Sequence, residues 1–246
     1  MVSHPIALVQ PKGRPDTPDV TETAPTPRPD TLVSALLLAT TGGLLDAFVY
    51  TQHGHVFANA ATGNVILLGI NMLSGNWHQA GRHLAPLLAF VAGVAASRLL
   101  RLLPHVRAGL SVLLLEMLVL FVAGLLPPAF PELAFTALIA FVSAFQVSTF
   151  RQVGRFSYNS TFITGNLRDC ADGFVGYFFD PDPQLRRDEL AKARKLTGIC
   201  LCFLGGVVAG TWGGPHLYNR TLWLTEPLLL VTAVRIFRIQ AAPELR

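Results

Sequence analysis

Six long apolar stretches dominate this chain and limit the structures that it can adopt. Each is close to the ~20 residues that cross a lipid bilayer as an α-helix. They cover residues 32–50, 84–103, 110–126, 133–150, 196–212 and 222–239. Of the 246 residues, 51% are hydrophobic and 14% charged, which is too apolar for an ordinary soluble domain of this length. The sequence therefore predicts an all-α integral membrane protein.

The first 30 residues have a different composition from the rest of the chain. They are rich in proline, with Thr, Asp and Arg between the prolines and few apolar residues to bury. Such a composition is typical of a disordered segment. We predict a disordered cytoplasmic tail over residues 1–30, followed by two membrane repeats over residues 31–127 and 131–240.

The two repeats are inferred from short motifs that occur in the same order in both halves. Each half has a polar residue in its first apolar stretch, then a Thr-Gly-Asn motif, then a glycine-rich stretch, then a glutamate in an apolar stretch. The matched residues are Asp46 and Gln146, Thr62-Gly63-Asn64 and Thr164-Gly165-Asn166, and Glu116 and Glu226. The glycine-rich stretches place Ala89, Gly93 and Ser97 in one half, and Gly206 and Gly210 in the other, at spacings that let helices approach closely.

The number of membrane crossings depends on whether the Thr-Gly-Asn segments span the bilayer. If each segment enters and returns, each repeat has three crossings and the two repeats are inverted; if each crosses, the chain has eight spans and the repeats are parallel. Basic residues favour the inverted arrangement, because with the N-terminus inside it leaves Arg82 and Arg220 outside. The eight-span alternative moves a group of arginines outside: Arg98, Arg101, Arg107, Arg151 and Arg155.

The Thr-Gly-Asn motifs are predicted to be breaks in the helical backbone, because glycine permits non-helical conformations. We expect Thr or Asn to cap the helices that follow, over residues 65–73 and 167–178. Broken helices inside a membrane occur where the backbone lines a cavity, and their N-terminal N–H groups attract anions or carbonyl oxygens. Thr62, Gly63, Asn64, Thr164, Gly165, Asn166 and Gln146 are therefore candidate substrate-binding residues. The alternative is that Thr and Asn only link adjacent helices by hydrogen bonds.

Three carboxylic side chains lie in apolar stretches, where an ionised group costs roughly 3 kcal/mol at the centre of a span. Asp46, Glu116 and Glu226 are candidates for proton or cation coupling. Structural hydrogen bonding, or a position near the lipid headgroups, is the alternative for each.

Other classes of function lack support in the sequence. There is no phosphate-binding loop, no His-Glu-x-x-His and no nucleophile elbow, so we predict no enzyme activity. The 3 cysteines lack metal-ligand spacing, and we predict no metal and no cofactor. The net charge of +4 is explained by orientation in the membrane, so we predict no nucleic-acid partner.

The chain resembles the YoaK-like family of multi-pass bacterial membrane proteins, a domain of unknown function. The resemblance covers residues 32–240 and is carried by "GGLLDAFVY", "VFANAATGNVILLG", "SAFQVSTFRQVGRFSYNSTFITGNL" and "FLGGVVAG". One departure follows Gln146, where the family tends towards Gln-Asn-Ala. The resemblance implies a bacterial inner or plasma membrane location and no established activity.

These observations favour a secondary transporter or permease for a small solute, with its site near the repeat interface and proton coupling by the carboxylic side chains. A channel for a small solute or anion is the nearest alternative, and a membrane scaffold or assembly protein is an alternative from another class. The expected partners are membrane lipids and an unidentified small molecule or ion, and a homo-oligomer is left open. Both termini are expected in the cytoplasm.

Overall fold

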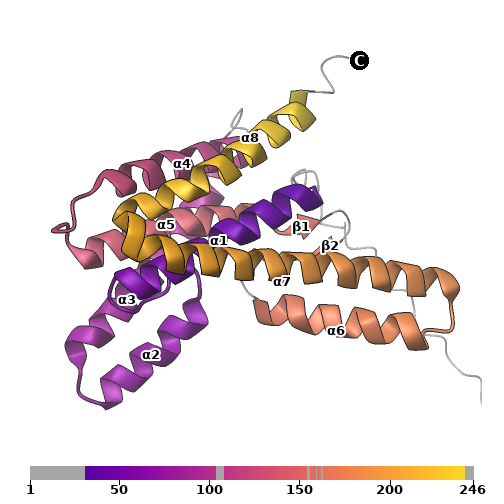
Figure 1. The fold of residues 1–246 in the computed structure, drawn as a ribbon, viewed down its shortest axis with the longest axis horizontal. Coiled ribbons are helices and arrows are strands. Elements are labelled where there is room, and N and C mark those ends of the chain that lie inside the picture. Colours follow the sequence, from indigo (N-terminus) through magenta and orange to yellow (C-terminus); the bar gives the residue numbers. More distant parts are fainter. Residues whose placement is uncertain (1–30, 104–107, 154–155, 159, 162, 242–246) are drawn as a thin grey trace, which may run out of the picture.

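The protein is a bundle of helices with two hairpins that extend from it (Figure 1). The computed structural model describes residues 31–103, 108–153, 156–158, 160–161 and 163–241, and the predicted tail over residues 1–30 lies outside this part of the chain. The helices are α1 (Leu32–Gln52), α2 (Ala61–Leu73), α3 (Trp77–Leu102), α4 (Ala108–Leu125), α5 (Glu132–Thr149), α6 (Ile163–Phe179), α7 (Pro183–Leu217), the 3₁₀ helix η1 (Tyr218–Thr225) and α8 (Glu226–Ala241). Two short strands, β1 (Gln152–Val153) and β2 (Phe156–Ser157), pair antiparallel between α5 and α6.

The apolar stretches of the sequence coincide with helices, as predicted. In the part of the chain that the structure describes, four helical stretches are long and apolar enough to cross a membrane. The last of them has 57 residues and joins α7, η1 and α8, and the chain reverses within it at η1, where Tyr218 has a φ of 52°. The apolar helix α4 has 18 residues. These helices agree with the predicted architecture of a helical membrane protein.

The interior of the bundle is built around α1 and α5. Side chains are buried along the whole of α1, among them Leu38, Leu45 and Phe48, each 0% exposed. By contrast, only 22% of the apolar window of α3 is buried, and its exposed residues include Leu88 and Val91. A helix that is apolar all round and buried belongs to the core, whereas exposed apolar side chains on outer helices suit contact with lipid.

Glycines allow the closest helix contacts, which confirms the predicted packing role of Gly93, Gly206 and Gly210. A Cβ atom at Gly206 would overlap the backbone carbonyl of Thr40 on α1, and one at Gly210 would overlap that of Leu44. In the other half of the chain, a Cβ atom at Gly93 on α3 would overlap the carbonyl of Phe141 on α5. Small residues at such contacts let two helix backbones approach closely.

Contacts along each helix pair define their relative directions. Helices α1 and α5 are antiparallel, because Leu38 contacts Gln146 while Phe48 contacts Phe135. Helix α4 is antiparallel to the η1–α8 segment: its C-terminal part contacts Trp223 at Gly124, and its N-terminal part contacts Ile236 at Gly109. The pairs α1 with α7 and α3 with α5 are parallel, as the order of contacts along each pair requires.

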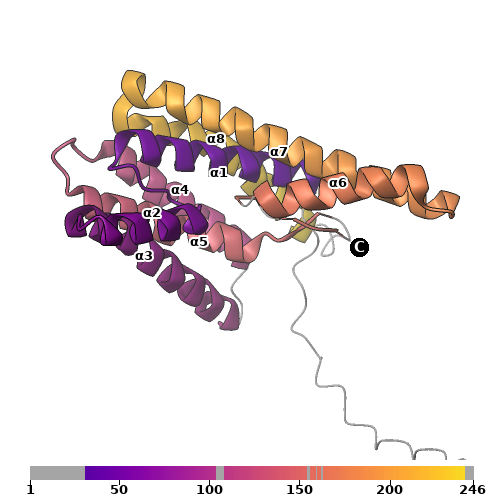
Figure 2. The same ribbon diagram turned by 90° about the horizontal axis from the view of Figure 1, so that it is seen from below.

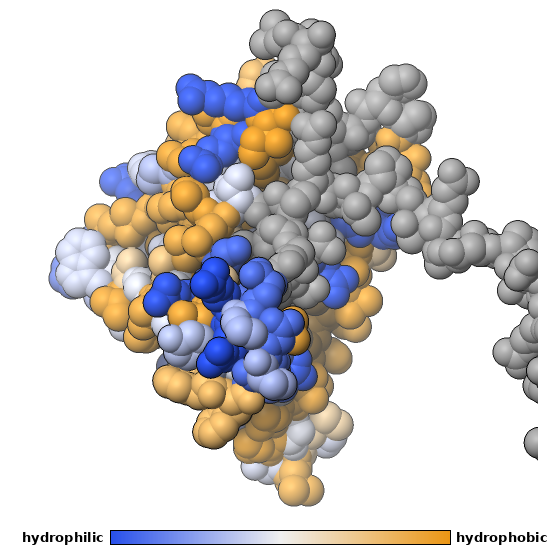
Figure 3. Space-filling view, turned by 90° about the vertical axis from the view of Figure 1, so that its right-hand side faces the viewer, coloured by the Kyte–Doolittle hydropathy of each residue, from blue (hydrophilic) through white to orange (hydrophobic). Residues whose placement is uncertain are grey.

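Two antiparallel helical hairpins extend from the bundle, α2 with α3 and α6 with α7 (Figures 1 and 2). Figure 3 shows that hydrophilic side chains gather at the end of the molecule where α6 meets α7, with hydrophobic surface around them. This end includes the exposed residues Asp182, Gln184 and Arg187. The hydrophilic cluster therefore places the α6–α7 turn in water or among lipid headgroups.

Candidate functional site

Asp46 is buried in the core and is tied to the segment that precedes α2. One oxygen, Oδ1, accepts hydrogen bonds from the backbone N–H groups of Asn59, at 2.6 Å, and Ala60, at 3.3 Å. The N-cap residue of α2 is Ala60, whose side chain makes no capping hydrogen bond. The N–H of Ala60 is one of the N–H groups at the start of α2 that have no partner within the helix, and the carboxyl group of Asp46 accepts from it 14 residues away.

Gln146 has a corresponding role on α5. Its Nε2 donates to the hydroxyl oxygen of Ser160, just before α6, at 3.4 Å, and to the backbone carbonyl of Leu38 on α1, at 3.1 Å. Ser160 also lies against α1, because a Cβ atom at Gly42 would be 3.1 Å from its carbonyl oxygen. Asp46 and Gln146 thus each contact the segment that leads into a Thr-Gly-Asn helix.

Several buried polar atoms along the α1–α5 contact have no hydrogen-bond partner among the described residues. They are Oδ2 of Asp46, both side-chain polar atoms of Asn59, Oγ of Ser143 and Oε1 of Gln146. We call these four residues the α1–α5 polar centre. Gln146 binds the carbonyl of Leu38. At 1.5 Å per residue, Leu38 lies about 12 Å from Asp46 along α1. Buried polar groups without partners are rare in folded proteins, so these four residues, which lie at two levels of the α1–α5 contact, are candidate binding residues.

The first Thr-Gly-Asn motif lies inside the first turn of α2, and the prediction that it is an unwound break with its own cap is wrong. The irregular backbone precedes the motif, over residues 53–60. Asn64 clamps this segment, because its Oδ1 accepts from the N–H of Phe57 at 2.9 Å and its Nδ2 donates to the carbonyl of Phe57 at 2.7 Å. Gly63 packs on the ring of Phe57, whereas Thr62 is exposed.

The second motif also lies within a helix, since α6 begins at Ile163, and here too the predicted unwinding is wrong. Asn166 is 3% exposed, while Thr164 and Gly165 are exposed. A Cβ atom at Gly165 would meet nothing within 4 Å, unlike one at Gly63. The two copies therefore share a buried asparagine and an exposed threonine, but not the environment of the glycine.

We expect Asn64→Ala to lower the free energy of unfolding by about 2 kcal/mol, because it leaves the partly buried N–H and carbonyl of Phe57 without partners. Thr62→Ala is the matched control, since Thr62 is exposed two residues away, and should change stability by less than ~0.5 kcal/mol. Thermal unfolding of the purified variants in detergent checks both values. Equal stability of the two variants would contradict a stabilising role for the hydrogen bonds between Asn64 and Phe57.

Glu116 and Glu226 form a second polar group, between α4 and α8. Glu116 is 0% exposed, and neither of its carboxylic oxygens has a hydrogen-bond partner among the described residues. Glu226 stands at the first position of α8, the helix that packs against α4. The two glutamates that the sequence repeat pairs therefore lie on neighbouring helices.

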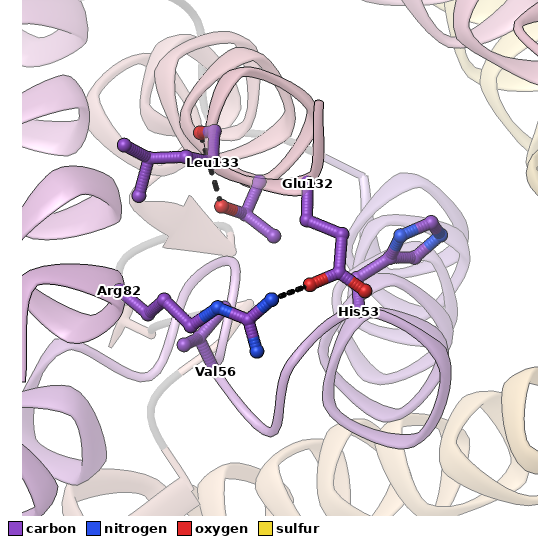
Figure 4. Close-up of a pocket in the computed structure, with 6 residues that line it drawn as sticks. His53, Val56, Arg82, Glu132 and Leu133 are labelled. Atoms are coloured by element: carbon purple, nitrogen blue, oxygen red, sulfur yellow. Dashed lines mark hydrogen bonds and ion pairs between the residues drawn. The ribbon is translucent and has the colours of Figure 1, made fainter. Parts of the chain in front are cut away.

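A third cluster links the ends of α1, α3 and α5 (Figure 4). Arg82 on α3 forms an ion pair with Glu132 on α5, beside a shallow depression that is also lined by His53, Val56, Leu133 and Thr136. Just beyond α1, the His53 ring stacks on Phe135 with centroids 4.0 Å apart, and its Nε2 is 3.1 Å from Oδ1 of Asn219. Burial lowers the pKa of His53, although the hydrogen bond to Asn219 and the charge of Glu132 act in the opposite direction.

Comparison with known proteins places this arrangement in a family. The family described as "Protein of unknown function (DUF1275)" matches residues 34–235. The chain belongs to this DUF1275 family. It is also 26% identical over 216 residues to the UPF0700 transmembrane protein YoaK of Bacillus subtilis (strain 168), covering 83% of this chain and 92% of that protein. No solved structure matches the chain. The predicted resemblance to YoaK-like proteins is confirmed, and the chain is a membrane protein of a family without an assigned function.

Two members of the polar centre in this DUF1275 protein were not among the predicted site residues. Asn59 stands in "NAATGN", three residues before Thr62 of the first motif, and Ser143 stands three residues before Gln146, on the same face of α5. Both are polar residues in apolar surroundings, which is the signal that could have identified them. No group of three or more His, Cys, Asp or Glu side chains with metal-binding geometry occurs in the described ranges.

Proposed function

We propose that this DUF1275 protein is a secondary transporter for a small solute, built from two inverted repeats and coupled to protons. The observation that carries the proposal is the α1–α5 polar centre, where buried side-chain atoms of Asp46, Asn59, Ser143 and Gln146 lack hydrogen-bond partners among the described residues. Polar and ionisable groups inside a membrane are costly, and they commonly mark a substrate or ion pathway. No catalytic residue, cofactor or metal is part of the proposal.

Helix directions support the inverted arrangement with six spans. If α1–α8 all crossed the membrane in alternation, α1 and α5 would run in the same direction, and so would α4 and α8. Both pairs are antiparallel, as an inverted repeat requires. At 13 residues, α2 is about 20 Å long at 1.5 Å per residue, which is shorter than the ~30 Å hydrocarbon core.

Equivalent contacts in the two halves support the same arrangement. Helix α1 packs on α7 of the other half, and α5 packs on α3 of the other half. In each contact a glycine of the matched glycine-rich stretches, Gly206 or Gly93, meets a backbone carbonyl of its partner helix. In the proposed arrangement, this exchange of matched helices would put α1 and α5 at the interface of the two repeats, where transporters with inverted repeats bind their substrates.

Each polar group is assigned a role on this basis. The amide groups of Asn59 and Gln146 suit hydrogen bonding to a polar solute, and the unpartnered oxygen of Asp46 suits exchange of a proton. Movement of the segments before α2 and α6 would then open the centre, with Asn64 acting as a clamp on the first of them. The Arg82–Glu132 ion pair is assigned to closure of the outer side, and Glu116 with Glu226 to a second proton-binding position. The protein is proposed to lie in the bacterial inner membrane with both termini in the cytoplasm.

Reconstitution of the purified full chain in liposomes tests the proposal. A panel of radiolabelled amino acids, sugars and carboxylic acids is offered under an imposed pH gradient, with protein-free liposomes as the control. A transporter gives saturable accumulation that the gradient drives. Flux without saturation, together with single-channel currents, would identify a channel instead. A stoichiometric partner that co-purifies, without flux or solute-dependent thermal shift, would identify a scaffold.

Cysteine labelling tests the inverted arrangement separately. In a chain whose native cysteines are replaced by alanine, Ser74→Cys in the α2–α3 turn and Pro181→Cys in the α6–α7 turn are both at exposed positions. The arrangement predicts that a membrane-impermeant maleimide labels Ser74→Cys in intact cells and labels Pro181→Cys only after permeabilisation. Labelling of both positions from one side is the result that eight spans require.

A further inference from the structure

Three arginines meet at the end of α3 without an acidic partner in the described part of the chain. Arg98 lies one helical turn before Arg101 on α3, and Arg151 follows Thr149 of α5, whose hydroxyl oxygen is 3.3 Å from Nη1 of Arg101. Arg98 and Arg151 are exposed. Like charges brought together repel one another, so a cluster of this kind gains stability when an anion lies between its members.

Hydrogen bonds from Arg101 hold it in place at this end of α3. Its Nη1 is 3.0 Å from the carbonyl oxygen of Ser148, 3.1 Å from Oγ of Ser97 and 3.3 Å from Oγ1 of Thr149. Ser97 and Thr149 are buried, and their hydroxyl oxygens are 3.3 Å apart. One edge of the Arg101 guanidinium is therefore fixed between α3 and α5, and the group is preorganised to bind an anion.

Exposed apolar side chains accompany the arginines. Leu99, Leu102 and Leu103 are 65%, 63% and 55% exposed, and Leu102 shares a helix face with Arg98 because the two are four residues apart. A free anion in water would make no use of these leucines. The phosphate of a lipid would meet the guanidinium groups while its acyl chains covered the leucines.

We infer that Arg98, Arg101 and Arg151 form a binding site for the phosphate of an anionic phospholipid in the leaflet that contacts the C-terminal end of α3. A guanidinium group matches phosphate geometry by bidentate hydrogen bonds, and clusters of basic residues at the ends of spans attract anionic headgroups. This inference does not depend on the proposed transport activity.

Binding of phosphatidylglycerol to the purified full chain tests the inference, with phosphatidylcholine as the zwitterionic reference. Each lipid is titrated in mixed micelles, and the thermal midpoint reports binding, because a ligand that binds only the folded state raises it. The double variant Arg98→Gln with Arg151→Gln should bind phosphatidylglycerol about 25-fold more weakly, at about fivefold for each arginine near an anionic surface. Neither residue is buried, so the variant should unfold at the wild-type temperature in phosphatidylcholine.

The control is Arg168→Gln with Arg220→Gln, which removes the same charge from two exposed positions elsewhere. It should keep the wild-type affinity for phosphatidylglycerol. A similar loss in this control, or an unchanged affinity in the Arg98 and Arg151 variant, would overturn the site. If inorganic phosphate stabilises the protein as strongly as phosphatidylglycerol does, the ligand is a free phosphate and the assignment to a lipid is wrong.

Discussion

Gly206→Val is expected to lower the thermal midpoint of the purified protein by roughly 10 °C, which corresponds to about 3 kcal/mol for a chain of this size. A Cβ atom at this position overlaps the carbonyl of Thr40 and comes within 2.9 Å of the backbone nitrogen of Leu44. Both atoms belong to the backbone of α1, so no side-chain rotation relieves the overlap. Helices α1 and α7 would have to separate along the longest contact in the bundle.

The neighbouring glycine provides a matched control for this prediction. A Cβ atom at Gly205 meets nothing within 4 Å, so Gly205→Val makes the same chemical change on the outer face of α7. Its thermal midpoint should stay within ~2 °C of the wild type, the small loss expected of an exposed substitution. Fluorescence-detected size-exclusion chromatography after heating measures both variants. Equal midpoints would contradict a close contact between α1 and α7.

Gly93→Val extends the comparison to the other half of the chain. Its Cβ would overlap the carbonyl of Phe141 and lie 2.8 Å from the Cβ of Ala144. If the two halves use equivalent contacts, this variant should lose about as much stability as Gly206→Val.

Local patterns in the sequence were enough to predict the helices and their closest contacts. The apolar stretches mark the helices because a span needs about 20 apolar residues whatever its neighbours are. Gly93 and Gly206 could be identified because only a small residue permits such close contact, and a small residue is visible in the sequence itself. The order of motifs predicts that Asp46 and Gln146 match, and each of them contacts the segment before a Thr-Gly-Asn helix.

The placement of the irregular backbone could not be found in this way, because it depends on contacts distant in sequence. The sequence of Thr62 to Asn64 favours a break and a local cap, but the donors before α2 are satisfied by Asp46 from α1. With these donors satisfied, the motif is free to be helical, and Asn64 turns back to Phe57. The roles of Arg101 and Ser143 likewise follow from the packing of α3 and α1 on α5, which no local pattern specifies.

Replacement of Asp46 by asparagine should separate its proposed role in proton exchange from its role as a hydrogen-bond acceptor for the segment before α2. Asparagine keeps an oxygen that can accept hydrogen bonds from the N–H groups of Asn59 and Ala60, but it cannot release or take up a proton. We therefore expect Asp46→Asn to fold and to catalyse exchange of solute across liposomes, while accumulation driven by a pH gradient falls to the level of protein-free liposomes. Asp172→Asn makes the same change at an exposed position on α6 and should accumulate solute like the wild type.

Asp46→Ala isolates the structural role, since it leaves the two N–H groups of Asn59 and Ala60 without an acceptor. It should lose about 3 kcal/mol of stability, because each buried unpaired donor costs about 1–3 kcal/mol. Thermal unfolding of both variants beside the flux assay distinguishes the outcomes. If Asp46→Asn accumulates solute as the wild type does, Asp46 serves only as the cap of α2, and proton coupling must be sought at Glu116 and Glu226. If Asp46→Asn loses exchange as well as accumulation, the carboxylate itself contributes to binding the solute.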